Sequence, residues 1–183
     1  MSFYRAGSIR ADRVNEQGTE HMSTHQTNRL LVHAIDPVRL DAVRTTGADG
    51  HGNQLRPFAA TGHGEPLRCC LRYAEPGEQI ALISYAPFEH PSVWREIGPV
   101  YIHAARCEGY TPTGWLPEEL ATGPRVLRTY RVDDTMNYEH NTVVIDQADL
   151  QPIIERLLSK PDVTTVHVRT LAPQCFLYAV AAH

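Results

Sequence analysis

Short runs of hydrophobic residues, separated by turn-forming residues, dominate the pattern of this chain. In several of these runs apolar and polar positions alternate, which is typical of strands with one buried face. Most connections are too short to hold the helix of a parallel crossover, so antiparallel pairing is expected. Strands are predicted at residues 29–35, 67–73, 79–85, 98–104, 125–131, 141–145, 163–170 and 175–181.

Helices are predicted at two or three places. Asp36 and Pro37 supply an N-cap and a first-turn proline for a helix over residues 36–44. Residues 147–160 carry leucines and isoleucines at helical spacing, and residues 117–121 form a short helix that a glycine ends. The pattern predicts an α+β fold: a curved, mainly antiparallel sheet that could close toward a barrel, with two or three helices.

Two segments differ in composition from the predicted strands and helices. Residues 1–28 are polar with few large apolar groups, so we expect an N-terminal extension that is loose in the monomer. Residues 29–183 are long enough for a single α+β domain with its own core. Within that domain, residues 45–66 are rich in Gly, His and Pro. Such a loop is either a lid over a pocket or a plain surface loop.

Composition narrows the class of protein. A hydrophobic fraction of 42% and a charged fraction of 21% are those of a soluble globular protein. The net charge of -4, without a run of Lys or Arg, argues against binding to nucleic acid. No apolar stretch approaches the ~18 residues of a membrane span, and the N-terminus lacks the apolar region of a signal peptide. We therefore expect a cytoplasmic protein that does not enter a membrane.

Several common catalytic motifs are absent from the sequence. It contains no GxSxG, no Walker A loop, no GxGxxG after a strand and no HExxH, so no nucleotide or nicotinamide cofactor is expected. A metal site could be assembled from His103, Cys107 and His167, but zinc needs three or four convergent ligands. Strand alternation would also place Cys69 and Cys70 on opposite faces. We therefore expect buried thiols, no metal and no cofactor.

Two arginines are predicted to share one face of a hairpin. The runs 67–73 and 79–85 are joined by a Pro-Gly turn, which predicts that they pair with each other. Alternation then sets Arg68 and Arg72 on the same side. A guanidinium binds a carboxylate with two parallel hydrogen bonds, so this face suits a carboxylate substrate. The alternative is an ordinary solvated strand face.

Glu96 is the candidate acid or base. It lies between Trp94 and Ile97, and burial against these apolar side chains would raise the pKa of its carboxyl group. Such a group can give and take a proton near neutral pH. The alternative is a surface ion pair with Arg95 or another arginine. His90, in the preceding loop, could shuttle protons or be a surface histidine.

Aromatic residues close to this segment are candidate substrate contacts. Tyr85, Phe88 and Trp94 could line a flat pocket for an aromatic substrate, although aromatic residues near strand ends are also common in cores. His103 lies on the predicted strand 98–104 and is expected in the core or in the wall of such a cavity.

Several short motifs stand out along the chain. They are RxCLR from Arg68, EPGE from Glu75, EIGPVYIHA from Glu96, Cys107, VHVR from Val166 and CF from Cys175. Together, over residues 30–183, they resemble the bacterial family catalogued as DUF1203, a domain of unknown function, which implies no activity. Two positions depart from the family pattern: Leu67 stands where the family often has Cys, and Gln174 where it usually has Gly. The missing cysteine further disfavours a metal site.

A second and looser resemblance concerns function. The size, and a strand-borne Arg followed by Glu, are similar to the small cofactor-free Pictet-Spengler enzymes of bacterial alkaloid pathways. That resemblance implies Glu96 as acid/base and Arg72 or Arg68 as the group that holds a substrate carboxylate. It predicts natural-product biosynthesis by condensation of a tryptophan-like amine with an aldehyde, without a cofactor.

An alternative function, a partner and an oligomeric state are also expected. The alternative function is a non-catalytic small-metabolite binding or accessory protein that uses the same cavity. In either case the partner is a small molecule with a carboxylate and an aromatic ring. A homodimer is expected, because closed two-fold dimers are the commonest assembly.

Overall fold

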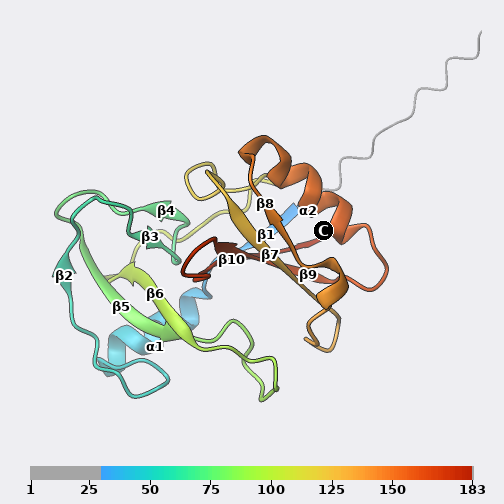
Figure 1. Cartoon of the computed structure of the whole chain (residues 1–183). Helices are drawn as coiled ribbons and strands as arrows, with labels where there is room; N and C mark the ends of the chain where they lie inside the picture. Colours follow the sequence, from blue (N-terminus) through green and yellow to red (C-terminus); the bar gives the residue numbers. More distant parts are fainter. Residues whose placement is uncertain (1–29, 183) are drawn as a thin grey trace, which may run out of the picture.

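The computed structural model describes residues 30–182, which form two five-stranded sheets and two α-helices (Figure 1). The predicted extension over residues 1–28 lies outside the described residues. The first sheet has the order β1 (Leu30–His33), β10 (Phe176–Ala182), β9 (Thr165–Thr170), β7 (Arg125–Tyr130) and β8 (Thr142–Val144). The second has the order β2 (Phe58–Ala59), β5 (Gln79–Tyr85), β6 (Gly98–His103), β3 (Pro66–Leu67) and β4 (Arg72–Tyr73). The helices are α1 (Pro37–Thr46) and α2 (Leu150–Leu158), with 3-10 turns η1 (Tyr138–His140) and η2 (Gln147–Asp149).

The predicted α+β class with a curved, mainly antiparallel sheet is confirmed, and its strands divide between two sheets. Every pair in the first sheet is antiparallel. In the second sheet one pair, β3 with β6, is parallel, and the other pairs are antiparallel. The second sheet curls more strongly, as β5 shows in Figure 1.

The first helix begins and ends as its sequence predicts. The Asp36 carboxylate accepts a hydrogen bond from the Val38 N–H at 2.8 Å, and Pro37 occupies the first turn. Gly47, at φ 69°, ends the helix by donating its N–H to the Val43 carbonyl. Leu40 is the buried residue of α1, and it packs into the core of the second sheet.

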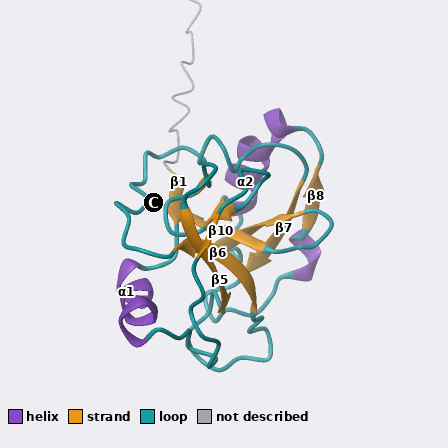
Figure 2. Cartoon of the chain, turned by 90° about the vertical axis from the view of Figure 1, so that its left-hand side faces the viewer, coloured by secondary structure: helices purple, strands orange, loops and turns teal. Residues whose placement is uncertain are grey.

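The second helix covers the first sheet, on the side of the molecule away from α1 (Figures 1 and 2). Its apolar residues recur at helical spacing, as predicted, and pack against strand residues such as Val166 and Val168. The buried members of the helix are Leu150, Ile154, Leu157 and Leu158. Each sheet therefore has its own apolar core and its own helix.

Two predicted elements are wrong. Residues 67–73 are not one strand and do not pair with residues 79–85, because β4 pairs back onto β3 while β5 pairs with β2 and β6. The Pro76-Gly77 turn exists, with Gly77 at φ 88°, but it connects strands that are not neighbours. The predicted helix at residues 117–121 is a single hydrogen-bonded turn that does not continue.

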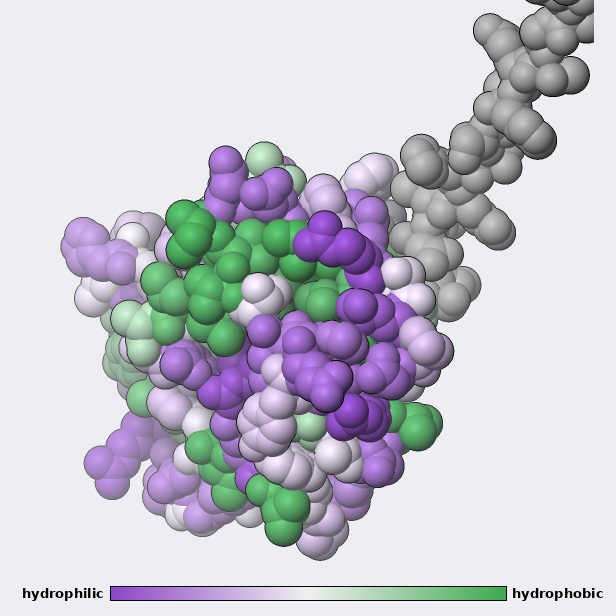
Figure 3. Space-filling view, turned by 45° about the vertical axis from the view of Figure 1, so that its right-hand side comes forward, coloured by the Kyte–Doolittle hydropathy of each residue, from purple (hydrophilic) through white to green (hydrophobic). Residues whose placement is uncertain are grey.

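The face drawn in Figure 3 has one large contiguous hydrophobic area bordered by hydrophilic residues, and smaller hydrophobic areas below it. Within residues 30–182 no helix has the length and apolar character needed to cross a membrane.

Candidate functional site

A tight turn between β3 and β4 brings two cysteines together. Residues 68–71 form this turn, which the N–H of Leu71 closes by donating to the Leu67 carbonyl at 2.9 Å. Leu71 has φ 58°, a left-handed conformation that is uncommon for a residue with a branched side chain. Because the segment is not a strand, the predicted alternation of Cys69 and Cys70 across a sheet is wrong.

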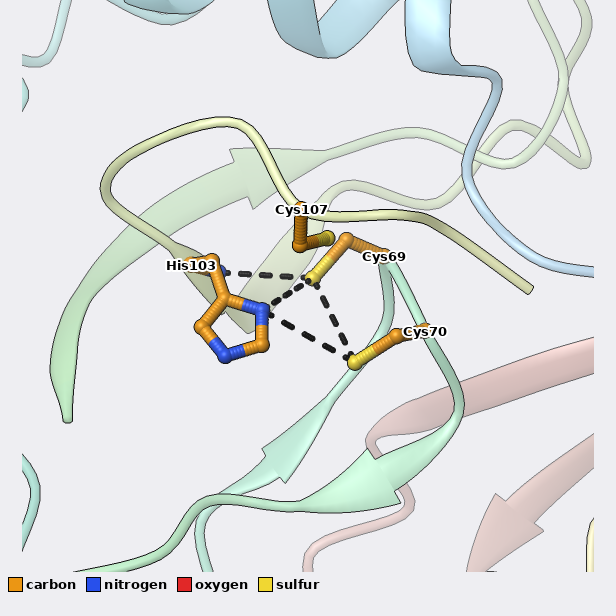
Figure 4. A group of neighbouring side chains, drawn as sticks. All are labelled: Cys69, Cys70, His103 and Cys107. Atoms are coloured by element: carbon orange, nitrogen blue, oxygen red, sulfur yellow. Dashed lines mark hydrogen bonds between the residues drawn. The ribbon is translucent and has the colours of Figure 1, made fainter.

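The turn places both thiols next to a histidine and a third cysteine (Figure 4). His103 comes from the end of β6, and Cys107 from the loop that follows. The Sγ atoms of Cys69 and Cys70 lie 3.9 Å apart, and they lie 3.4 and 3.8 Å from Nδ1 of His103. All four donor atoms, Cys107 Sγ included, lie within 4.8 Å of one another. We call these four residues the cysteine site.

The spacing of the donors matches a tetrahedral ion. With zinc bonds of ~2.3 Å to sulfur and ~2.0 Å to nitrogen, tetrahedral angles put sulfur atoms ~3.8 Å apart and sulfur ~3.5 Å from nitrogen. The observed Cys69–Cys70 distance of 3.9 Å and the two distances to His103 fall close to these values. Three thiols and one imidazole are also a donor set that zinc prefers. The residues present therefore fit a four-coordinate metal ion.

A carboxylate and a guanidinium lie next to the outer ring nitrogen of His103. Oε1 of Glu78 lies 3.4 Å and a guanidinium nitrogen of Arg72 lies 3.3 Å from Nε2 of His103, on the side of the ring away from the sulfur atoms. Arg72 holds Glu78 with two hydrogen bonds, of 2.6 and 2.9 Å. These hydrogen bonds lower the pKa of Glu78 to about 2. A carboxylate on the outer nitrogen is the usual partner of a metal-binding histidine, because it orients the ring.

The thiols influence one another strongly. Cys69 donates to Cys70, and this hydrogen bond, together with burial, raises the pKa of Cys69. The same hydrogen bond lowers the pKa of Cys70, while burial raises that of Cys107. The backbone N–H of His103 donates to Cys69 Sγ at 3.3 Å. The sulfur atoms are thus crowded together within hydrogen-bonding reach rather than kept apart by apolar side chains.

One side of the cysteine site is open. A cleft of about 540 Å³ is lined by Cys70, His103 and Cys107, together with Arg72 and Glu78. Cys69 is buried, and the other three members are half-buried. A metal ion would therefore reach the site from this cleft. Arg72 and His103, both predicted as contacts for a substrate, lie here.

Glu96 lies in a different place from Arg72. Its two carboxylate oxygens accept hydrogen bonds from Arg128 and Arg169, one oxygen to each guanidinium. The Glu96 side chain is 41% exposed, so it is not enclosed by apolar groups as predicted. It lines a cleft of about 450 Å³ between the two sheets, with Tyr85 on the wall. The structure therefore does not bring Glu96 and Arg72 together.

Arg68 does not share a face with Arg72. Its side chain is buried, and its Nε donates to the carbonyl of Phe176 at 2.7 Å. A second nitrogen donates to the Pro66 carbonyl. Burial lowers the pKa of Arg68 to about 10. This arginine joins the turn to β10, and it is not placed to bind a substrate.

His90 and Trp94 lie in the loop before Glu96 and contact the first sheet's connections. Nε2 of His90 lies 2.6 Å from the Asp134 carboxylate, and the His90 side chain is largely exposed. The ring of Trp94 packs edge-on against Tyr138 at 5.3 Å. These two residues are therefore engaged in loop packing, away from both clefts.

Phe88 and Tyr85 do not form one flat pocket with Trp94. Phe88 packs against Tyr130 and the buried His167, with ring centroids 4.8 and 4.9 Å away. Tyr85 lies 5.7 Å from the Phe176 ring and lines the cleft that contains Glu96. Of the predicted aromatic contacts, Tyr85 is the one that lines either of these two clefts.

The sequence pattern does not reveal Arg128, Arg169 or Glu78 in their observed places, and it separates Cys69 from Cys70. Arg128 and Arg169 lie on β7 and β9, far along the chain from Glu96, and alternation alone gives no reason to join them to it. The VHVR motif that ends at Arg169 is the one signal of its position. The sequence offers Cys107 as a possible metal ligand with His103 and His167. His103 does lie beside it, whereas His167 is buried among aromatic rings.

Comparison with known proteins identifies the family. No curated protein and no solved structure matches the chain. The family model described as "Protein of unknown function (DUF1203)" matches residues 64–181, which is more than half of the chain. That match includes Cys69, Cys70, His103 and Cys107. The chain therefore belongs to the DUF1203 family.

Proposed function

We propose that this protein binds one zinc ion, or a similar soft divalent metal, through Cys69, Cys70, His103 and Cys107. The observation that carries the proposal is the convergence of four donor atoms within 4.8 Å of one another. They come from a turn, a strand end and a loop, so no single local motif accounts for their meeting. Thiols that serve only as apolar filling need no such convergence on an imidazole nitrogen.

The donor set favours zinc over magnesium or calcium. Thiolate sulfur is a soft ligand, whereas magnesium and calcium prefer oxygen. The outer nitrogen of His103 faces both the Glu78 carboxylate and the Arg72 guanidinium, while Nδ1 is directed at the sulfur atoms. Metal binding requires the outer nitrogen to donate a hydrogen bond to Glu78. With the outer nitrogen protonated, Nδ1 carries the lone pair that a metal requires.

The proposed role of the ion is structural. Four protein ligands fill a tetrahedral ion and leave no open position for a substrate. Bound there, the ion joins the turn 68–71 to the end of β6 and to the loop that holds Cys107. The turn is short and contains a residue with positive φ, so a metal cross-link would compensate for its cost.

Metal content provides the direct test. The full chain is purified without chelator, and bound metals are measured by mass spectrometry against protein concentration. We expect about one zinc per chain in the wild type. Cys70→Ser and Cys107→Ser are expected to lose the metal. Cys175→Ser is the matched control, because Cys175 lies outside the cysteine site, and it is expected to keep the metal. A wild-type protein that neither contains zinc nor takes it up from solution contradicts the proposal.

Condensation of a tryptophan-like amine with an aldehyde stays a prediction from the sequence. It requires a carboxyl group that exchanges protons opposite an anchoring arginine. Glu96 is instead held by Arg128 and Arg169, and Arg72 by Glu78. The geometry therefore favours the metal site as the first hypothesis. Incubation of the protein with tryptophan and small aldehydes tests the prediction, and a rate equal to background would contradict it.

A homodimer is likewise a proposal. The hydrophobic area in Figure 3 is the kind of surface that a second copy can cover. Sedimentation of the purified chain tests this, and a single monomeric species contradicts it.

A further inference from the structure

We propose that the cleft between the two sheets binds a small molecule through its carboxylate, at the position that the Glu96 carboxylate fills. We call Arg128, Arg169, Glu96 and Gln174 the arginine cleft. This inference goes beyond the metal site and is independent of it, because the two sites share no residue.

The charges in the arginine cleft do not balance. The side chains of Arg128 and Arg169 are only 19% and 7% exposed, and both are paired with the single carboxylate of Glu96. Arg68 is buried nearby and donates to the carbonyl of Phe176, which lines the same cleft, and to that of Pro66; within residues 30–182 it forms no ion pair. Poorly solvated cations need anionic partners, so this excess of positive charge favours an anionic ligand.

The two guanidinium groups are fixed on the first sheet. Arg128 on β7 lies directly opposite His167 on β9, and Arg169 follows His167 by two positions. All three therefore face the same side of the sheet, toward the cleft. Burial, with the positive charges of Arg169 and Arg128, lowers the pKa of His167 to about 3, so the histidine adds no charge of its own at neutral pH.

Gln174 holds the same two arginines from the other side. Its side-chain oxygen accepts from Arg128 at 2.6 Å, and its backbone carbonyl accepts from Arg169 at 2.6 Å. Gln174 has φ 52°, a conformation that glycine adopts more easily. A strained residue that contacts both guanidinium groups indicates that their orientation is fixed before any ligand binds.

Glu96 is the residue of the arginine cleft that a ligand carboxylate would displace. It lies just before β6, at the end of a loop without regular structure, and its side chain is 41% exposed. The arginines stand on strands in the middle of a sheet, and they are far less exposed. A ligand carboxylate that entered the cleft would meet the same two donors after Glu96 moved outward, with two charge-assisted hydrogen bonds restored.

The walls of the cleft suit an organic ligand. Tyr85 and Phe176 lie side by side, with ring centroids 5.7 Å apart, and both line the cleft with Pro99. The volume of about 450 Å³ falls in the range of small-molecule sites. A carboxylate attached to a flat apolar group therefore matches both the charged base and the apolar wall.

Calorimetric titration with benzoate tests this inference on the full chain. Benzamide is the matched neutral probe, and inorganic phosphate is a tetrahedral anion. We expect benzoate to bind, benzamide not to bind, and phosphate to bind more weakly than benzoate. Glu96→Gln is expected to tighten benzoate binding roughly threefold to tenfold, because the competing carboxylate is gone. Arg128→Gln is expected to weaken binding at least about tenfold.

Matched controls keep the result interpretable. Arg156→Gln removes an exposed arginine on α2, far from the cleft in sequence, and is expected to bind benzoate as the wild type does. If Arg128→Gln lacks the wild-type circular dichroism spectrum, Arg128→Lys replaces it and is expected to weaken binding several-fold, because lysine lacks the planar fork. Metal content is measured in each preparation, so failure of this inference is distinguishable from failure of the cysteine site.

Three results would overturn the inference. The first is the absence of benzoate binding in both the wild type and Glu96→Gln. The second is an equal loss of binding in Arg128→Gln and Arg156→Gln, which would mean that only overall charge matters. The third is phosphate binding tighter than benzoate binding, which would assign the cleft to a phosphate instead.

Discussion

The cysteine site and the arginine cleft are both partly buried polar sites, but each needs a charge of the opposite sign. The cysteine site gathers three sulfur atoms and a ring nitrogen, all of which can donate electron pairs to a cation. The arginine cleft gathers two guanidinium groups around one carboxylate, an arrangement that suits an anion. What each region can bind therefore follows from which kind of group its backbone brings together.

The two regions also differ in how the fold builds them. The cysteine site is built at one edge of the second sheet, from a turn and the end of the neighbouring strand. The arginine cleft joins the two sheets, since Glu96 precedes β6 while both arginines stand on the first sheet. Loss of the ion should therefore loosen one sheet edge, whereas changes in the cleft should alter how the two sheets contact each other.

Removal of the metal is expected to have the largest effect. Incubation with a strong zinc chelator should lower the stability of the wild-type chain by several kcal/mol, because the ion binds the folded state alone. For a chain of this size this corresponds to a fall of the melting temperature by on the order of 10 °C. Thermal melts with and without chelator measure it. Cys107→Ser should melt at the lower temperature under both conditions, and a chelator-insensitive wild type would refute a structural ion.

Acidification is expected to lower the free energy of unfolding through His167, which lies on the same face of the first sheet as Arg128 and Arg169. The pKa of His167 falls from 6.5 to about 3 because of burial and the charges of Arg169 and Arg128. The unfolded chain therefore takes up a proton below about pH 6.5 that the folded chain refuses until about pH 3. The contribution of His167 to the free energy of unfolding is fully present above pH 6.5. It decreases as the pH falls, by roughly 2 to 3 kcal/mol at pH 4.5.

Urea unfolding at pH 7, 5.5 and 4.5 measures this contribution. His167→Phe keeps an aromatic ring among Phe88 and Tyr130 and removes the titrating group, so its stability should decline less with acid than that of the wild type. The cysteine site is the same in both proteins, so any loss of metal with acid affects both alike and the difference between them isolates His167. His63→Gln, in an exposed loop, should decline as the wild type does. Parallel curves for wild type and His167→Phe would exclude this role.

Loss of the Glu78 carboxylate is expected to have a smaller effect, confined to the cysteine site. Glu78→Gln should weaken zinc binding about 10- to 100-fold, because His103 loses the group that orients its ring and raises its basicity. Competition with a coloured chelator measures the affinity. Glu75→Gln removes an exposed carboxylate three residues earlier and should bind zinc as tightly as the wild type. Equal affinities for all three proteins would place Glu78 outside the metal's surroundings.

The sequence predicts both α-helices well, because their signals are local. Asp36, Pro37 and Gly47 mark both ends of α1, and the spacing of leucines and isoleucines marks α2. The turn 68–71 carries no such signal. It contains no Gly, Pro or Asn, and its Leu71 takes a left-handed conformation that only the pairing of β3 with β4 imposes.

The candidate sites are harder to predict than the helices for the same reason. If residues 67–73 formed one strand, alternation would separate Cys69 from Cys70 and join Arg68 to Arg72. Both results reverse when the chain turns at Arg68. The contact of Glu96 with Arg128 and Arg169 depends on how two sheets pack, and no spacing along the chain encodes it.

The smallest expected effect concerns Gln174 and sharpens the comparison from the side of the arginine cleft. Gln174→Gly relieves the positive φ but removes the hydrogen bond to Arg128, so its stability should lie within about 1 kcal/mol of the wild type. Gln174→Ala loses the same hydrogen bond and keeps the strain, so it should be about 1 kcal/mol less stable than Gln174→Gly. Urea unfolding measures both. Both substitutions retain the backbone carbonyl that accepts from Arg169. Neither should change zinc content, because the cysteine site is untouched. An alanine variant as stable as the glycine variant would mean that the left-handed conformation carries no strain. The strain at Gln174 would then no longer support the view that the two guanidinium groups are fixed before a ligand binds.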